Sequence, residues 1–243
     1  SFRWVLFVAG INFFSLGGLT QATIAAPQTS QYCQGQLQDG WLTGFYRCQF
    51  PGGNRFQGNF RQNEREGQGV FVYADGTRCE GNFRDNRLNG RGICRFASGN
   101  RYEGEFRQNE REGQGVFVYA DGTRCEGTFR SNALTGFGRC RFASGNQYEG
   151  AFQANVRQGH GIFTYTDGTR CEGEFRQNAM NGSGKCTYPN GDRYEGSFQN
   201  NQRHGRGVYV FANGTRSQGR WSNGNPPPVK PSPPKPRAKP TKR

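Results

Sequence analysis

The sequence predicts an all-β protein: an elongated, single-layer antiparallel sheet of about eight β-hairpins, with an N-terminal signal helix before it and a disordered C-terminal tail after it. Three observations favour this fold class. A period of 23 residues runs through most of the chain. The composition includes 38 glycines and 21 phenylalanines but one methionine among 243 residues, which suits short strands and tight turns. Turn dipeptides such as Asp121-Gly122 recur at one phase of the period, as hairpin turns should.

The first 26 residues differ from the rest of the chain. Arg3 precedes an apolar stretch at 4–19, and small residues follow at 22–26, an order typical of an export signal. Two alternatives stay open for residues 1–26. They form a signal peptide cleaved after Ala25 or Ala26, or an uncleaved signal anchor, although the apolar run is short of the roughly 20 residues that a membrane span needs. Both alternatives predict an exported protein that is periplasmic, held in the cell envelope or secreted.

Residues 31–224 form the expected repeat domain, with eight full copies of the 23-residue unit and a half copy at 215–224. A period of 46 residues overlies the shorter one, because the stretch 61–81 recurs unchanged at 107–127. Each copy is expected to hold two short strands with a polar loop between them.

An odd period would turn equivalent side chains to opposite faces if every loop had an even length. A three-residue loop such as Ala120-Asp121-Gly122, closed by a left-handed glycine, absorbs the extra residue. Tyr119 is then expected opposite Thr123, and Phe117 opposite Cys125.

The eight cysteines occupy two fixed phases of the repeat and always occur together. In the intervening copies the same two phases hold aromatic pairs, so the two positions exchange identity jointly and are expected to be in contact. The predicted disulfides join Cys33 to Cys48, Cys79 to Cys94, Cys125 to Cys140, and Cys171 to Cys186. Each closes a loop of about 15 residues and contributes roughly 3 kcal/mol in the chain-entropy model. The predicted aromatic ladder consists of Phe56, Phe71, Tyr102, Phe117, Tyr148, Phe163, Tyr194 and Tyr209.

Nothing in the sequence predicts catalysis, a metal or a cofactor. The chain has no C-x-x-C motif, and its two histidines, His160 and His204, are expected in hairpin loops without a nucleophile beside them. A glutamate recurs in six consecutive copies, as at Glu103 and Glu126, and in five of them an arginine lies two residues before it. This serial pattern indicates a structural charge ladder on the face opposite the aromatic side chains, because a catalytic site is singular.

The order Tyr-Glu-Gly-x-Phe, then Gly-x-Gly, then Asp-Gly resembles the MORN repeat. The resemblance covers residues 31–224 and is strongest at 102–104, 148–150 and 194–196. Cysteine replaces the aromatic residue in alternate copies, and Gln34 replaces the glutamate of the first copy. The resemblance implies a twisted single-layer β-strip. It also implies a scaffold, a dimerising module or a membrane-proximal tether, although no kinase or transferase domain accompanies the repeats here.

The formal net charge of +14 indicates acidic partners. The tail at 225–243 contains six basic residues and no acidic one, and it is expected to be an extended, disordered arm. The residues expected to contact an anionic surface are Lys230, Lys235, Arg237, Lys239, Lys242 and Arg243.

These features together predict a non-catalytic scaffold or adaptor of the cell envelope that presents its β-strip to a protein partner. The alternative is a membrane-associated module that binds anionic lipid or polysaccharide. Nucleic acid would be the partner only if the export interpretation were wrong. An open sheet edge near Trp221 predicts end-to-end pairing of copies. Two uses of the aromatic face stay open: a core, or a surface on which ligands stack.

Overall fold

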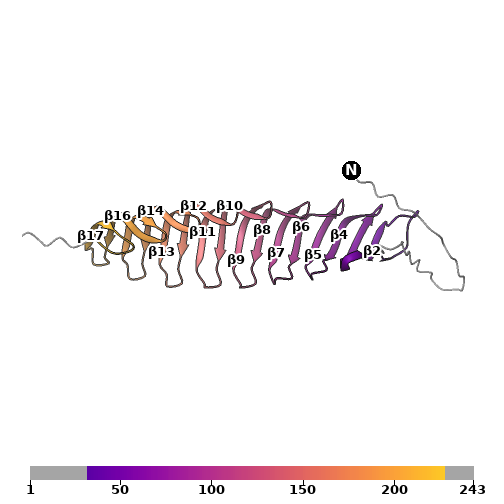
Figure 1. Cartoon of the computed structure of the whole chain (residues 1–243), viewed down its shortest axis with the longest axis horizontal. Helices are drawn as coiled ribbons and strands as arrows, with labels where there is room; N and C mark the ends of the chain where they lie inside the picture. The colour runs from indigo at the N-terminus through magenta and orange to yellow at the C-terminus, as the bar shows by residue number, and fades with distance from the viewer. Residues whose placement is uncertain (1–31, 228–243) are drawn as a thin grey trace, which may run out of the picture. The chain divides into compact units, whose positions relative to one another are not determined.

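The computed structural model describes residues 32–227, so the predicted signal segment and nearly all of the predicted tail lie outside the described residues. Two compact units divide the chain, Ser1–Val156 and Arg157–Arg243. The described part is all-β, with 17 strands and one short 3-10 helix, η1 (Pro51–Gly53). Within each unit the strands follow one another in chain order (Figure 1).

The strands of the first unit are β1 (Tyr32–Gln34), β2 (Gly44–Gln49), β3 (Arg55–Arg61), β4 (Glu64–Val72), β5 (Arg78–Arg84), β6 (Arg87–Arg95), β7 (Arg101–Arg107), β8 (Glu110–Val118), β9 (Arg124–Arg130), β10 (Ala133–Arg141) and β11 (Gln147–Gln153). β12 (Val156–Thr164) begins with the last residue of the first unit. The other strands of the second unit are β13 (Arg170–Arg176), β14 (Ala179–Thr187), β15 (Arg193–Gln199), β16 (Gln202–Val210) and β17 (Arg216–Trp221).

Consecutive strands pair antiparallel. Their register is the one predicted from the two repeat positions that hold either two cysteines or two aromatic residues. In the first unit, Tyr102 lies opposite Phe117, Phe117 opposite Cys125, and Cys125 opposite Cys140. In the second unit the same row runs from Phe163 through Cys171, Cys186, Tyr194 and Tyr209 to Ser217. The half copy therefore supplies one strand, and serine stands at the cysteine phase.

The loops between copies have the predicted three-residue form. The Tyr119 amide donates to the Thr123 carbonyl at 2.8 Å, and the Gly122 amide donates to the Tyr119 carbonyl at 3.0 Å. Gly122 has a φ of 90°, in the region where a side chain is strained. The odd period is absorbed here, which keeps equivalent side chains on one face.

The loops within copies are shorter than the sequence predicts. β7 continues to Arg107 and β8 begins at Glu110, so the predicted polar loop is a two-residue turn. Gln108 and Asn109 have φ values of 51° and 70°, the pattern of a type I′ turn. The prediction of a longer loop was wrong, because asparagine tolerates this conformation in a tight turn. The strands therefore continue through the polar residues on both sides of it. For the same reason His160 and His204 lie in β12 and β16 and not in loops.

Each hairpin bends sharply across its middle. The ring centres of Tyr102 and Phe106 are 5.1 Å apart, whereas residues four apart in a straight strand are separated by roughly 13 Å. The pairing of β7 with β8 shifts register between Gly104 and Phe106, which places a bulge at the bend. The sheet thereby encloses the side chains of its inner face.

The paired glycines of the Gly-x-Gly motif lie beneath the enclosed aromatic ring. A Cβ atom added at Gly104 or Gly115 would overlap the Tyr102 side chain. Tyr102 is 0% exposed, and its hydroxyl donates to the Glu105 carbonyl at 3.2 Å. The glycines therefore make the space in which each hairpin buries its largest ring.

Candidate functional site

The four predicted disulfides are confirmed. Cys33–Cys48, Cys79–Cys94, Cys125–Cys140 and Cys171–Cys186 each join the two strands of one hairpin, with Cα atoms 4.0 to 4.1 Å apart. No free cysteine occurs among residues 32–227. The disulfides lie on the inner face, in the row that the aromatic pairs occupy in the alternate hairpins.

The predicted aromatic ladder forms the core of each unit. Phe56, Tyr102, Tyr148 and Tyr194 are almost completely buried, and Phe71 and Phe117 are buried as well. Phe163 and Tyr209 are half-buried. These rings also contact rings of the next hairpin, as the ring centres of Tyr102 and Phe129 are 5.0 Å apart. The buried rings do not offer an open face on which a ligand could stack.

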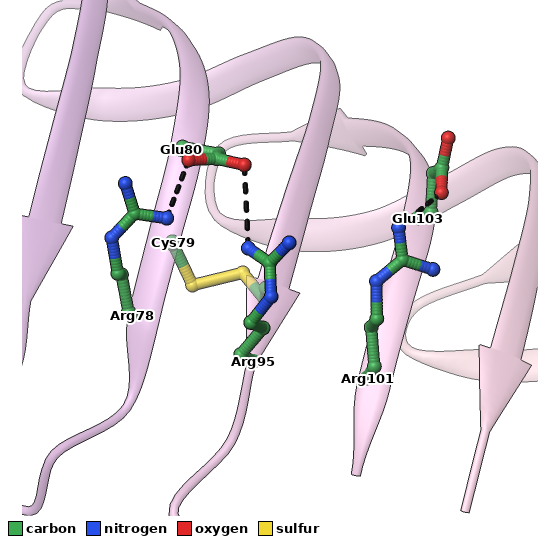
Figure 2. A network of polar contacts seen from close by, with 7 residues as sticks. Arg78, Cys79, Glu80, Arg95, Arg101 and Glu103 are labelled. Atoms are coloured by element: carbon green, nitrogen blue, oxygen red, sulfur yellow. Dashed lines mark hydrogen bonds and ion pairs between the residues drawn. A yellow bond between two sulfur atoms is a disulfide. The ribbon is translucent and has the colours of Figure 1, made fainter.

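The outer face carries the predicted ladder of charges. Glu80 accepts hydrogen bonds from Arg78 and, at 3.3 Å, from Arg95 (Figure 2). Arg101 pairs with Glu103 in the same way (Figure 2), whereas Arg193 forms no ion pair with Glu195. The hydrogen bond from Arg78, together with Arg95, holds the pKa of Glu80 below its usual range. Glu80 is therefore charged at neutral pH and paired with two arginines.

An open groove of about 900 Å³ follows the outer face of the first unit. Glycines of consecutive strands form its floor: Gly81, Gly92, Gly104, Gly115, Gly127 and Gly138. One wall is a row in which each residue lies opposite the next one on the neighbouring strand: Glu80, Ile93, Glu103, Val116, Glu126 and Arg139. The other wall contains Arg91, Glu105, Gln114, Thr128 and Phe137. The groove crosses the strands because both rows are built from one residue per strand.

Apolar side chains interrupt the charges of the groove. Ile93 and Val116 alternate with the glutamates of their row, and Phe137 is 60% exposed at one end. The Arg139 guanidinium carbon lies 5.9 Å from the centre of the Phe137 ring. This groove was not predicted from the sequence. The sequence feature that indicates it is a β-branched residue at outward-facing positions, as at Ile93 and Val116.

The structure contributes little to the predictions on metals, membranes and the tail. Among residues 32–227, no group of three or more histidine, cysteine, aspartate or glutamate side chains could hold a metal ion. No helix in that same part of the chain reaches the length and apolar character of a membrane span. The predicted anionic-surface contacts lie outside the described residues: Lys230, Lys235, Arg237, Lys239, Lys242 and Arg243.

The predicted open edge is the free side of β17. Within the second unit β17 pairs with β16, and Trp221 is only 3% exposed because it covers Tyr194 and Tyr209. Trp221 thus closes the core of this unit. End-to-end pairing of copies stays a prediction.

Serial hairpins, a shared inner row and a repeated outer face define a β-hairpin repeat protein. The family model for the MORN repeat matches seven consecutive segments, residues 56–78, 79–101, 102–124, 125–147, 148–170, 171–193 and 194–216. The chain belongs to the MORN repeat family. The matched segments leave out the first hairpin, although β1 and β2 keep the same register and the same disulfide.

Comparison with solved structures finds similar folds at low sequence identity. The TCP domain of SAS-4 (dCPAP) from Drosophila melanogaster, in complex with a proline-rich motif of Ana2 (dSTIL), is 12% identical with a TM-score of 0.42. The match covers 79% of this chain and 99% of that one. The G-box domain of the microcephaly protein CPAP is 11% identical with a TM-score of 0.46, and the match covers 84% of this chain and 100% of that one. No curated protein matches the sequence.

Proposed function

We propose that this protein is a non-catalytic scaffold that binds a protein partner along the outer groove of its first unit. The observation that carries the proposal is the groove itself, which has a glycine floor and walls made of one residue per strand. A serial surface of this kind suits an extended partner segment, because each pair of strands offers an equivalent contact about 10 Å further on.

The side chains of the groove are suited to selective recognition. Ile93, Val116 and Phe137 supply apolar contact area, and aromatic residues are enriched among the energetic centres of interfaces. The flanking glutamates and arginines are already paired with one another, so binding there does not leave a buried charge without a partner. The partner segment therefore needs apolar side chains more than it needs charge.

Four disulfides support a location in an oxidising compartment, as expected for an exported or envelope protein. In this proposal residues 1–26 direct export, and the basic tail at 225–243 adds a second contact with an anionic surface.

Site-specific photo-crosslinking in the native envelope tests the proposal. A photoreactive residue at Phe137 or Val116 is expected to give one or two discrete protein adducts. The same residue at Arg130, which is exposed but does not line the groove, serves as the matched control. Phe137→Ala should weaken capture of the adduct partner by about tenfold. Equal adducts at all three positions, or none at Phe137 and Val116, would remove the groove from the proposal.

A further inference from the structure

One position near the hairpin turn distinguishes the two kinds of hairpin. In the hairpins with a disulfide this position holds the apolar residues Leu42, Leu88, Leu134 and Met180, all buried. In the hairpins with an aromatic pair it holds Arg65, Arg111, Arg157 and Arg203. A charged side chain has therefore been placed at a core position in every second hairpin.

Each of these arginines lies over the aromatic pair of its own hairpin. The guanidinium carbon of Arg65 is 4.7 Å from the ring centre of Phe71 and 5.6 Å from that of Phe56. Arg111 lies 4.8 Å from Phe117 and 5.7 Å from Tyr102. A planar guanidinium ion stacks well on aromatic faces, which explains why arginine accompanies the ring pair.

The guanidinium groups of Arg65, Arg111 and Arg203 keep hydrogen-bond donors that residues 32–227 do not use. Within residues 32–227, no carboxylate oxygen lies within 4.0 Å of the guanidinium nitrogens of Arg65, Arg111 or Arg203. Arg111 donates to the Asn132 carbonyl at 2.7 Å, and Arg203 donates to the Gly224 carbonyl at 3.0 Å.

The unused nitrogens reach solvent. In the described part of the chain, the buried side-chain polar atom that lacks a hydrogen-bond partner is Nδ1 of His204. The guanidinium nitrogens of Arg65 form no hydrogen bond with any described residue and are therefore not sealed in the core.

A tyrosine adjoins the arginine in both aromatic hairpins of the first unit between β3 and β8. Tyr73 and Tyr119 are each 38% exposed and contact the rings of Phe71 and Phe117 at 4.6 Å. Tyr73 and Arg65 both contact the Phe71 ring, with centre distances of 4.6 Å from the Tyr73 ring and 4.7 Å from the Arg65 guanidinium carbon. The turn carboxylate of Asp75 already accepts two hydrogen bonds from Thr77, at 2.8 and 3.0 Å. Each site thus offers guanidinium N–H groups beside a phenolic O–H group.

We propose that the stacked arginines within each unit bind the oxyanion groups of an extended anionic polymer, such as a sulfated or phosphorylated polysaccharide. Arg65 and Arg111 lie four strands apart, roughly 19 Å at the usual strand spacing, so one chain can engage both. A recessed guanidinium suits a thin polymer chain better than the flat surface of a membrane. Binding at two or more sites on one chain raises the affinity well above that of a single anion. These arginines belong to the inner face, so the inference does not depend on the outer groove.

Two variants of the full-length protein, each with four substitutions, distinguish binding at the stacked arginines from a general effect of positive charge. In the seam variant, Arg65, Arg111, Arg157 and Arg203 are all changed to methionine, the residue found at the equivalent position 180. In the control variant, the exposed Arg61, Arg84, Arg107 and Arg130 are changed to methionine, so the loss of charge is the same. The probes are fluorescent dextran sulfate, inorganic sulfate, and phosphatidylcholine vesicles with added phosphatidylglycerol, all at about 0.15 M salt.

The wild type is expected to bind dextran sulfate at least about tenfold more tightly than the seam variant, and at most about threefold more tightly than the control variant. Inorganic sulfate should compete only at millimolar concentration or above. Equal losses in the two variants, or no binding by the wild type, would overturn the proposal. Vesicle binding that depends on the same four arginines would show that the ligand is a membrane and not a polymer. Competition by inorganic sulfate below millimolar concentration would show that the ligand is a free anion.

A measurement on the wild type covers the case in which the seam variant does not fold. Titration with dextran sulfate should shift the side-chain Nε–Hε resonances of Arg65 and Arg111 more than those of Arg84 and Arg107. Single Arg→Met variants assign these resonances. Shifts confined to the exposed arginines would contradict the site.

Discussion

Asparagine in the left-handed conformation closes each hairpin after the first and ties it to the hairpin before it. Asn109 has a φ of 70°, its Oδ1 accepts from the Leu88 amide at 2.7 Å, and its own amide donates to the Leu88 carbonyl at 3.0 Å. The same pair of bonds recurs in both units, at Asn63, Asn86, Asn132, Asn155, Asn178 and Asn201. One side chain therefore serves both the turn and the contact between neighbouring hairpins.

Asn109→Ala should lower the free energy of unfolding by about 2 kcal/mol, because it strains the turn and leaves the Leu88 amide without its acceptor. Asn109→Gly keeps the backbone conformation and loses only the side-chain bond, so its cost should be about half as large. Urea unfolding of both variants measures the difference. Equal costs would show that the left-handed turn contributes nothing to the role of this asparagine.

One copy replaces an asparagine and phenylalanine by a hydrogen-bonded pair. Asn100 and Phe117 stand at the positions that Asp192 and Tyr209 occupy four copies later. The Tyr209 hydroxyl donates to Asp192 Oδ2 at 2.6 Å, and this bond is the main cause that lowers the pKa of Asp192. Burial raises the pKa of Tyr209 to about 12, and Asp192 adds to the rise.

The lowered pKa fixes the sign of the pH dependence. Asp192 stabilises the fold above its unfolded pKa, about 3.9, and this stabilisation is lost as the pH falls below that value. Tyr209 stabilises the fold below its unfolded pKa, about 10, and its contribution is lost as the pH rises towards the folded value. Both contributions are present at neutral pH.

The double variant Asp192→Asn with Tyr209→Phe should flatten the acid limb of the stability profile, because it restores the uncharged pair found at Asn100 and Phe117. The wild-type urea midpoint is expected to fall more than that of the double variant between about pH 5 and pH 3. Parallel profiles over this range would show that Asp192 does not titrate differently in the folded and unfolded states.

At the scale of the hairpin, the disulfide and the aromatic pair with its arginine are alternative ways to fill the same enclosed space. In the disulfide hairpin of β9 and β10, a Cβ atom added at Gly138 would lie 3.2 Å from Leu134 Cδ2. In the aromatic hairpin of β7 and β8, the Tyr102 ring takes the corresponding place over Gly115. The leucine and the ring are therefore spatial equivalents, although they come from different sequence positions.

Removing one disulfide as Cys125→Ala with Cys140→Ala should lower the free energy of unfolding by about 3 kcal/mol, since a loop of about 15 residues is no longer closed. The triple variant Cys125→Tyr, Leu134→Arg and Cys140→Phe installs the aromatic set and should recover part of that loss. Guanidinium unfolding followed by tryptophan fluorescence compares them. A triple variant less stable than the alanine pair would show that the two kinds of hairpin are not interchangeable.

The register of each hairpin could be predicted from the sequence, whereas its bend could not. Joint exchange of Cys125 and Cys140 with Tyr102 and Phe117 identifies opposed residues, and the invariant turn glycine explains the odd period. Alternation reports which face a side chain occupies and carries no information on curvature. The bend arises where the Tyr102 ring settles over Gly104 and Gly115, a contact that the spacing of the three residues does not specify. The groove on the outer face follows from that bend and was missed with it.

At the scale of the whole molecule, the duplicated element is a pair of hairpins, one of each kind. Between β2 and β9 in the first unit, each strand pairs with its immediate neighbours in sequence, so a hairpin depends only on the hairpins beside it. Stability in such an array is approximately a sum of repeat and neighbour contributions. The length of the array is therefore adjustable in steps of 46 residues without a change at any junction.

Deleting residues 79–124 joins Arg78 to Cys125 and reproduces the sequence that follows Arg78 in the parent chain, apart from later substitutions. This 46-residue deletion should retain a cooperative thermal transition and three disulfides, because every face and every pairing is preserved. Deleting residues 79–123 instead leaves one extra residue, which turns the following strand so that its inner side chains point outward. The second variant should therefore lose the cooperative transition and form mispaired or free cysteines, as circular dichroism and mass spectrometry after alkylation would detect. If both deletions folded equally well, the alternation of faces would not be what holds the hairpins in register.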